Sequence, residues 1–208
     1  MEIIYGNSDN CNTYILKKLD LCIIIDPGSD YELINDTIEG FKVLAVFLTH
    51  GHADHFCFIN KINIPYSVPI FIHKKDEELL KNDSENGFLL LKTKLAKIDW
   101  TPLNLKIFDS DFEFKFLNKK IKVYLTPGHT RGHVLYEYET NLFTGDTIFL
   151  DTIGRTDFSH SNPRLIAKTL EMIAKYPNNF KIYPGHDECF TIRALKKSNP
   201  FLKFNSKK

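Results

Sequence analysis

The chain contains 208 residues, of which 43% are hydrophobic and 25% are charged, an ordinary composition for a globular protein. Its 27 lysine and arginine residues nearly balance 26 aspartate and glutamate residues, so the composition indicates neither a nucleic-acid partner nor binding to an acidic membrane surface. Chains of this length commonly fold around one core, and we therefore expect a single domain spanning residues 1–208.

The N-terminal residues and the cysteines indicate the cellular compartment. The first residues lack the basic region and the long apolar stretch of a secretory signal. Cys11, Cys22, Cys57 and Cys189 show no CxxC spacing, and a chain of this size does not need disulfides to fold. We expect reduced thiols in a cytoplasmic protein, with Cys57 as a small buried side chain. The sequence leaves the oligomeric state open.

The first half of the chain alternates short apolar runs with helical patterns. Residues 31–39 have helical spacing, with Ser29 or Asp30 as the capping residue, and residues 43–48 form a continuous run typical of a strand buried on both faces. The predicted elements, in chain order, are strands at 2–5, 13–16 and 21–25, a helix at 31–39, strands at 43–48 and 69–72, and a helix at 74–81.

The second half has the same character. Residues 164–175 form an amphipathic pattern with Pro163 at the first turn, which predicts a helix. The predicted elements are strands at 105–107, 112–116, 121–125, 134–138 and 141–144, the helix at 164–175, a strand at 180–183 and a helix at 190–197. Two strand-rich halves, each with helices, indicate an α+β fold in which two sheets pack face to face with helices outside.

A dense group of metal-ligand residue types follows the predicted strand at 43–48. The sequence His50-Gly51-His52-Ala53-Asp54-His55 places three imidazoles and one carboxylate within six residues, and both groups bind zinc and iron. His50 and His52 can point the same way in an extended segment, whereas the adjacent Asp54 and His55 diverge. This spacing favours two neighbouring metals over one.

Three more predicted strands end in residues of the same types. The sequences are Thr126-Pro127-Gly128-His129-Thr130-Arg131-Gly132-His133, Phe143-Thr144-Gly145-Asp146-Thr147 and Tyr183-Pro184-Gly185-His186-Asp187. Each of these three sequences is a weak signal on its own. Residues of functional sites often lie in loops at strand ends, however, and here four predicted strands are each followed by residues that can bind a metal. The sequence therefore predicts a metal centre built from distant strand ends.

These ordered motifs resemble the metallo-β-lactamase-fold hydrolase superfamily. Residues 153–158 (IGRTDF) and 199–202 (NPFL) are most similar to the short glyoxalase II-like subgroup, the relatives of hydroxyacylglutathione hydrolase. The resemblance implies a four-layer αββα sandwich of two mixed β-sheets flanked by helices. The short stretch after His186 leads us to expect a chain without the C-terminal helical domain of full-length glyoxalase II.

The resemblance also implies a ligand set. His50, His52 and His129 would hold one metal, Asp54, His55 and His186 would hold a second, and Asp146 would bridge them. Two zinc ions are the implied cofactor, with iron or manganese found in related sites. Two metals at such a site lower the pKa of bound water toward ~7, which gives a metal-bound hydroxide, and Asp54 would orient this nucleophile as the catalytic residue.

The expected reaction is hydrolysis of a small-molecule thioester such as a hydroxyacylglutathione. A leaving thiolate titrates near ~8.5 and needs no strong general acid, whereas an amide nitrogen would need a proton donor. The alternative is a mononuclear-iron persulfide dioxygenase, which shares the GRTDF string, although the TGDT string and Pro184-Gly185-His186 look more like the hydrolases. The lack of an export signal disfavours a secreted β-lactamase, and the neutral charge disfavours a nuclease.

Several neighbouring residues have open or secondary roles. Arg131, which stands where many relatives have proline, and His160 are weak candidates for substrate binding. His133 is either a hydrogen-bond partner of His129 or a packing residue. His73 is expected to cap a turn or helix, and Arg155 and Asp157 are expected to form an ion pair that braces their loop.

Overall fold

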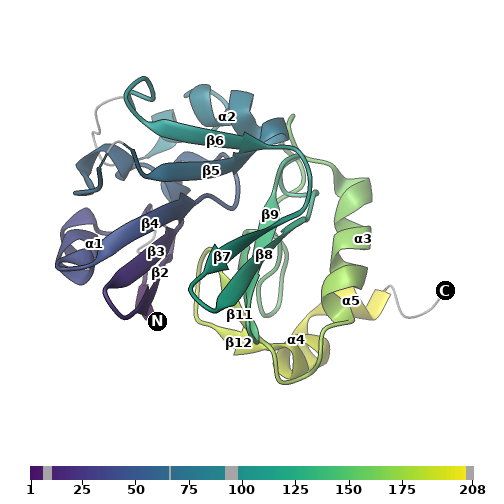
Figure 1. Ribbon diagram of the computed structural model, residues 1–208. Coiled ribbons are helices and arrows are strands. Elements are labelled where there is room, and N and C mark those ends of the chain that lie inside the picture. The colour runs from purple at the N-terminus through teal and green to yellow at the C-terminus, as the bar shows by residue number, and fades with distance from the viewer. Residues whose placement is uncertain (7–10, 66, 92–97, 205–208) are drawn as a thin grey trace. The chain divides into compact units, whose positions relative to one another are not determined.

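The computed structural model describes residues 1–6, 11–65, 67–91 and 98–204, and it divides into two compact units (Figure 1). The first unit is Met1–Phe108 and the second is Asp109–Lys208. Each unit contains one six-stranded sheet and its own helices. That the two units together make one domain stays a prediction.

The sheet of the first unit is mixed. Its strand order is β1-β2-β3-β4-β5-β6, with antiparallel pairing from β1 to β3 and parallel pairing from β3 to β6. The strands are β1 (Glu2–Ile4), β2 (Thr13–Lys18), β3 (Leu21–Ile25), β4 (Lys42–Phe47), β5 (Pro69–His73) and β6 (Asn104–Phe108). The parallel pairing places the carboxyl ends of β3, β4 and β5 at one edge of this sheet.

Short helices of the first unit bury their apolar faces against this sheet. Asp30 caps α1 by accepting from the backbone N–H groups of Glu32 and Leu33, and Ile34 and Ile38 of α1 join Ile24 and Val46 in the core. The helices are α1 (Tyr31–Ile38), η1 (Ala53–His55), η2 (Ile59–Lys61), η3 (Lys74–Asp76), α2 (Glu77–Lys81) and η4 (Phe88–Leu90).

The sheet of the second unit has the order β12-β11-β10-β9-β8-β7. Among its described strands, β10 and β11 form the one parallel pair, and the other neighbouring pairs are antiparallel. The strands are β7 (Phe112–Phe116), β8 (Lys119–Leu125), β9 (Val134–Tyr138), β10 (Asn141–Gly145), β11 (Lys181–Pro184) and β12 (Phe190–Thr191). Because β8 and β10 are both antiparallel to β9, strands β8, β10 and β11 run in the same direction.

The described helices of the second unit are α3 (Pro163–Ala174), α4 (Ile192–Ser198) and α5 (Pro200–Phe204). The side chain of Asn162 caps α3, and Pro163 occupies its first turn, where a missing N–H costs nothing. Ile166, Leu170 and Ile173 of α3 pack with Leu135 and other buried side chains of the sheet. Burial of this apolar stripe fixes the helix on one face of the second sheet.

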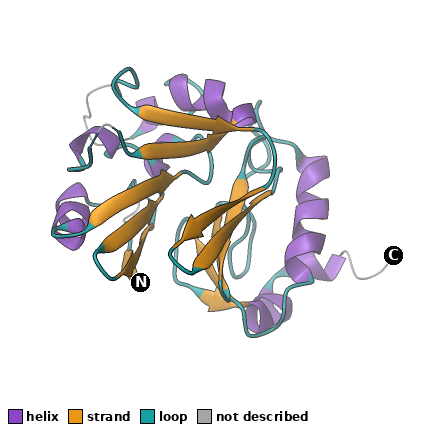
Figure 2. Cartoon of the chain, in the orientation of Figure 1, coloured by secondary structure: helices purple, strands orange, loops and turns teal. Residues whose placement is uncertain are grey.

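The predicted fold class is confirmed: two mixed β-sheets with flanking helices (Figure 2). Two predicted helices begin differently from expectation. Residues 74–76 form a 3-10 turn before α2, and Phe190–Thr191 pair with β11 before α4 begins. Thr191 ends the strand because its hydroxyl caps α4 by accepting from the N–H of Ala194.

Among the described residues, every helix is too short or too polar to span a lipid bilayer.

Candidate metal centre

In the first unit, the carboxyl ends of β3 and β4 carry the residues of interest. Asp26 follows β3 directly, and Thr49 and His50 follow β4 after one buried leucine. These two strands are parallel neighbours, so their ends lie together. The structure therefore brings the histidine cluster next to Asp26, to which the sequence assigned no role.

The four donor residues of the cluster lie close together. His50 Nε2 is 3.0 Å from His52 Nδ1, and the ring centroids of His50 and His55 are 4.2 Å apart. His55 Nε2 is 3.6 Å from Asp54 Oδ2. His52 is extended, and the single turn of η1 then begins, so the backbone changes from an extended to a turn conformation directly after His52. The three imidazoles are buried, and the carboxylate of Asp54 is 24% exposed.

Asp26 organises this cluster through both of its carboxylate oxygens. Oδ1 accepts from the N–H of Thr49 at 2.7 Å, and Oδ2 accepts from the Thr49 hydroxyl at 2.7 Å. Oδ2 also lies 2.9 Å from Nδ1 of His55. Asp26 is buried and has a φ of 51°, a left-handed conformation that aspartate tolerates better than most residues. An aspartate between a buried strand and a Pro-Gly turn was the signal that the sequence offered for this role.

These contacts settle which ring nitrogens carry protons. The Thr49 hydroxyl donates to Asp26, so it accepts from Nδ1 of His50, which lies 3.0 Å away. Nδ1 of His55 likewise donates to the Asp26 carboxylate. In both histidines the proton lies on Nδ1, and the Nε2 lone pair is directed to the neighbouring donors.

Close backbone packing holds the cluster in place. The N–H of Gly51 donates to Asp76 Oδ2 at 3.1 Å. A Cβ added to Gly28 would lie 1.7 Å from the carbonyl oxygen of Asp54, which no side chain can accommodate without moving the backbone. Gly28 is therefore required for the position of Asp54.

Two cysteines border the same turn as hydrogen-bond donors. Cys11 Sγ donates to the carbonyl of Asp26 and Cys57 Sγ to that of Gly28, both at 3.5 Å. Burial raises the pKa of the Cys11 thiol to about 12 and raises the pKa of Cys57 as well, so both stay protonated. All four cysteines are free thiols, and Cys57 is buried, as expected.

In the second unit, three strands end at one edge and each is followed by a predicted donor. His129 follows β8, Asp146 follows β10 and His186 follows β11. Asp146 Oδ2 lies 3.7 Å from His129 Nε2 and 3.7 Å from His186 Nε2. The shared direction of these strands thus gathers one carboxylate between two imidazoles.

His129 has a fixed tautomer as well. Its Nδ1 lies 2.8 Å from the carbonyl oxygen of Arg155, which can only accept, so the proton is on Nδ1. Nε2 then presents its lone pair on the side of Asp146. A Cβ on Gly154 would lie 1.8 Å from the carbonyl oxygen of Asp146, so this glycine allows the close approach in the second unit that Gly28 allows in the first.

His133 supports Asp146. The N–H of Asp146 donates to Nε2 of His133 at 3.2 Å, and Nδ1 lies 3.0 Å from the hydroxyl of Thr147. Its ring lies 6.0 Å from that of His129, in an edge-to-face arrangement. His133 therefore holds the backbone of Asp146 and contacts the hydroxyl of Thr147, and its role as a hydrogen-bond partner of His129 stays a prediction.

The secondary residues are placed as follows. Arg155 and Asp157 form the expected ion pair, with contacts of 3.0 and 2.8 Å on the surface, and this pairing raises the pKa of Arg155 and lowers that of Asp157. Arg131 donates to the carbonyl of Ser159 at 3.2 Å, and His160 stacks on Phe158. His73 caps η3 by accepting from the N–H of Lys75, which confirms its predicted capping role.

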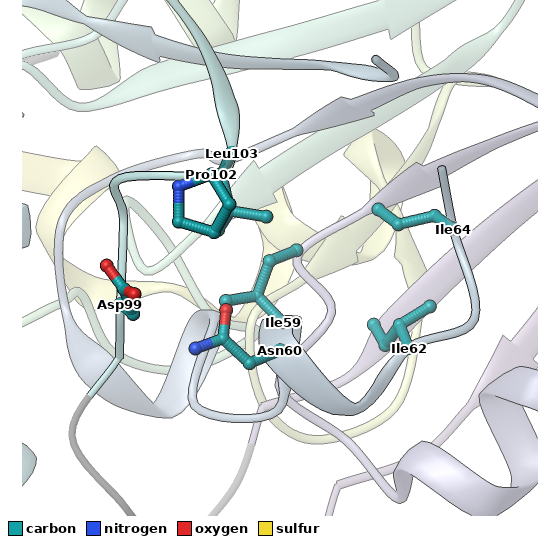
Figure 3. Close-up of a pocket in the computed structure, with 7 residues that line it drawn as sticks. All are labelled: Ile59, Asn60, Ile62, Ile64, Asp99, Pro102 and Leu103. Atoms are coloured by element: carbon teal, nitrogen blue, oxygen red, sulfur yellow. The ribbon is translucent and has the colours of Figure 1, made fainter. Parts of the chain in front are cut away.

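The first unit also contains a cavity of about 170 Å³, which is lined by other residues than these donors (Figure 3). Five of its seven lining residues are apolar, and Asn60 and Asp99 supply the polar side chains. The lining residues are Ile59, Asn60, Ile62, Ile64, Asp99, Pro102 and Leu103. None of the predicted donors lines it.

The donor chemistry of each unit fits a divalent metal. Imidazole and carboxylate together suit zinc and iron, and the histidine Nδ1 atoms bonded to Asp26, Thr49 and Arg155 are the outer contacts that metal-binding histidines require. The first unit offers His50, His52, Asp54 and His55, and the second offers His129, Asp146 and His186.

Comparison with known proteins places this arrangement in a family. Residues 6–186 match the family model described as the Metallo-beta-lactamase superfamily. A probable metallo-hydrolase of Methanocaldococcus jannaschii is 33% identical over 206 residues, covering 95% of this chain and 97% of the relative. A probable metallo-hydrolase of Streptococcus pyogenes is 30% identical over 198 residues, covering 92% of this chain and 85% of the relative.

Solved structures give the same result. The crystal structure of the B3 metallo-beta-lactamase BLEG-1 matches with a TM-score of 0.85 and 28% identity, covering 97% of this chain and 98% of that one. A protein described as being in a di-iron-bound form, TTHA1623, matches in fold with a TM-score of 0.81 at 23% identity, covering 97% of this chain and all, 100%, of that one.

Proposed function

Because the chain belongs to the metallo-beta-lactamase superfamily, we propose that it is a metal-dependent hydrolase whose two units contribute donors to one pair of metal ions. His50, His52 and His129 would hold one ion, Asp54, His55 and His186 the other, and Asp146 both. Such a pair would supply an activated water and would polarise the carbonyl oxygen of a substrate. Zinc is the expected metal, and the di-iron relative makes iron the main alternative.

The observation that carries this proposal is the common orientation of three histidines. His50, His55 and His129 each engage Nδ1 in an outer hydrogen bond and keep Nε2 within 3.0 to 3.7 Å of another proposed donor. Histidines that only filled space in the core would have no reason to direct the same nitrogen, Nε2, toward another donor in all three rings. The arrangement instead matches what metal binding needs.

Within this proposal, the residues of the chain hold the metal ions and orient the attacking water. Asp54 has a partly exposed carboxylate and would accept a hydrogen bond from the attacking water. Asp26 keeps His55 in one tautomer, and His133 holds the backbone of Asp146; both side chains are buried. Both ring nitrogens of His133 are already in hydrogen bonds, so it cannot bring a proton to a leaving group.

We propose a thioester as the substrate, cleaved by an enzyme of the glyoxalase II-like type in the cytoplasm. A leaving thiolate departs without a proton donor, which is consistent with the engagement of His133. The four free thiols support a reducing compartment. The second candidate reaction is β-lactam hydrolysis, which the name of the BLEG-1 enzyme favours.

One preparation can decide between these reactions. We would measure zinc, iron and manganese by mass spectrometry, then assay lactoylglutathione hydrolysis, cephalosporin hydrolysis and oxygen uptake with glutathione persulfide. We expect about two metal ions per chain and thioester hydrolysis as the main activity. One iron per chain with oxygen uptake would instead support the persulfide dioxygenase.

Variants from each unit test the site itself. His52→Ala and Asp146→Ala should each lower kcat/KM by more than ~100-fold, because each removes a proposed ligand. The matched control is Asp36→Ala, which removes an exposed carboxylate from α1 and should leave activity unchanged. Full activity in either ligand variant would refute the proposed site.

A further inference from the structure

Two phenylalanine side chains lie beside the proposed ligands of the second unit. The ring centroid of Phe158 is 6.1 Å from that of His129, and the ring centroid of Phe149 is 6.4 Å from that of His186. Both phenylalanines are half-buried, so each residue keeps part of its surface accessible to solvent. Asp146 lies between the two histidines, and each end of this triad therefore has an aromatic neighbour.

The loop that carries Phe158 is bound to the turn that carries His129. Ser161 Oγ donates to the carbonyl of His129 at 2.6 Å, and the N–H of Asn162 donates to the carbonyl of Gly128 at 2.8 Å. Arg131 adds its contact to the carbonyl of Ser159. The ring position is thus fixed before any ligand binds, which lowers the entropic cost of using it for recognition.

The Phe158 ring is also held through its faces. His160 stacks on it with centroids 5.2 Å apart and an interplanar angle of 12°, and the guanidinium carbon of Arg155 lies 4.3 Å from the ring centroid. Arg155 is paired with Asp157 and Arg131 with a carbonyl, so the nearby positive groups already have partners. This loop therefore presents an aromatic side chain to a ligand and not an unpaired charge.

The turn that carries Phe149 is held from the C-terminal side. The amide of Asn199 donates to the carbonyl oxygens of Phe149 and Thr152, at 2.9 and 2.8 Å, and Asn199 is fully buried. The N–H of Phe149 donates to the carbonyl of Thr152 at 3.0 Å. Leu150, which follows directly, is 40% exposed and extends the apolar surface.

We propose that Phe149 and Phe158 form the acyl-binding surface of this enzyme and select substrates whose acyl group carries an aromatic ring. The inference rests on the proposed thioesterase function and names its substrate class. Aromatic pairs contribute beyond the burial of their area, and a fixed ring beside the reacting carbonyl would favour an aryl acyl group over a methyl group.

The first test compares two acyl groups on one thiol. The wild-type protein should hydrolyse phenylacetylglutathione with a kcat/KM at least about tenfold above that for acetylglutathione. Phe149→Ala and Phe158→Ala should each bring this ratio down several-fold while metal content stays unchanged. Phe201→Ala, which removes an exposed ring from α5, is the matched control and should keep the wild-type ratio.

Phe149→Leu and Phe158→Leu keep apolar volume and protect against loss of folding, and they should give intermediate ratios. Equal losses for both substrates in all four variants would overturn the aromatic selection, because they would show a general effect on the site. Thermal unfolding of each variant identifies any that does not fold.

A binding measurement separates this inference from the proposed reaction. Calorimetry with the metal-loaded protein should show phenylacetate binding at least about tenfold tighter than acetate, and the Phe→Ala variants should lose the difference. Equal binding of the two acids would overturn the acyl surface whether or not thioesters are cleaved. Absence of thioester hydrolysis with preserved aryl preference would refute the proposed reaction alone.

Discussion

At the scale of single residues, Asp26 links two strand ends to two histidines. Its carboxylate bonds to Thr49 and His55, and Thr49 in turn bonds to His50. One buried carboxylate thus determines the tautomers of two proposed ligands in different parts of the loop. Such an outer carboxylate commonly changes metal affinity by about 10–100-fold when removed.

We predict that Asp26→Asn lowers metal affinity within that range and affects the site of His55 more than that of His52. Asparagine keeps the size and tolerates the left-handed backbone of Asp26, but its amide would donate to Nδ1 of His55. The His55 proton would then move to Nε2 and block the metal lone pair. Metal titration against a chelator measures this, and unchanged affinity for both ions would contradict the role assigned to Asp26.

The residue scale also shows what the sequence can reveal. The seven proposed donors were predictable because each lies directly after a strand or in one dense motif. Asp26 was not, since its partners Thr49 and His55 are 23 and 29 positions away. Gly28 and Gly154 were not either, because their importance depends on which carbonyl group packs against them.

At the scale of elements, strand positions followed from apolar runs and turn residues, and the helix at α3 from its amphipathic pattern. The start of α4 did not, because Phe190 and Thr191 pair with β11 through backbone hydrogen bonds, which depend little on the identity of the side chain. The single turns η2 and η4 also escaped prediction, since three residues are too few to show a helical period.

A half-buried tyrosine connects α3 to its sheet and gives the second unit an alkaline pH dependence. The hydroxyl of Tyr176, just beyond α3, donates to Glu137 of β9 at 2.9 Å. Burial, together with this glutamate, raises the pKa of Tyr176 above its usual value near ~10. The contribution to stability is therefore complete below pH ~10 and is lost as the pH rises from there toward the raised pKa.

We predict that Tyr176→Phe lowers the free energy of unfolding by about 1 kcal/mol at pH 7 and that its difference from wild type shrinks above pH ~10. Tyr31→Phe is the matched control, because its hydroxyl also contacts a glutamate but on the surface, and it should have little effect. Urea unfolding at several pH values tests both. A difference that grows with pH would contradict the assignment.

At the scale of the whole molecule, the fold class was readable because four strand ends carried the motifs of one family. The sequence indicated two strand-rich halves, but it did not show the boundary between Phe108 and Asp109, since both halves alternate strands and helices in the same way. The proposed metal pair would draw donors from both units, so metal should stabilise the molecule as a unit.

We predict that chelation lowers the midpoint of thermal unfolding by about 5–10 °C, the size expected when a ligand present at 100 times its Kd is removed. Restored metal should reverse the shift. His52→Ala in the first unit and Asp146→Ala in the second should both abolish this metal-dependent shift, whereas Asp36→Ala should retain it. A full shift in either ligand variant would show that its unit contributes no donor.

The common direction of β8, β10 and β11 also has a practical consequence for work at surfaces. Their donors all emerge at one edge, so the tight turns at Leu117 and Glu139 lie at the opposite edge of this sheet. A cysteine introduced at exposed Thr140, in a chain whose exposed Cys189 is replaced by serine, would accept a maleimide anchor there. The protein could then be immobilised on a sensor or electrode with the donor edge of the second unit turned toward the solution.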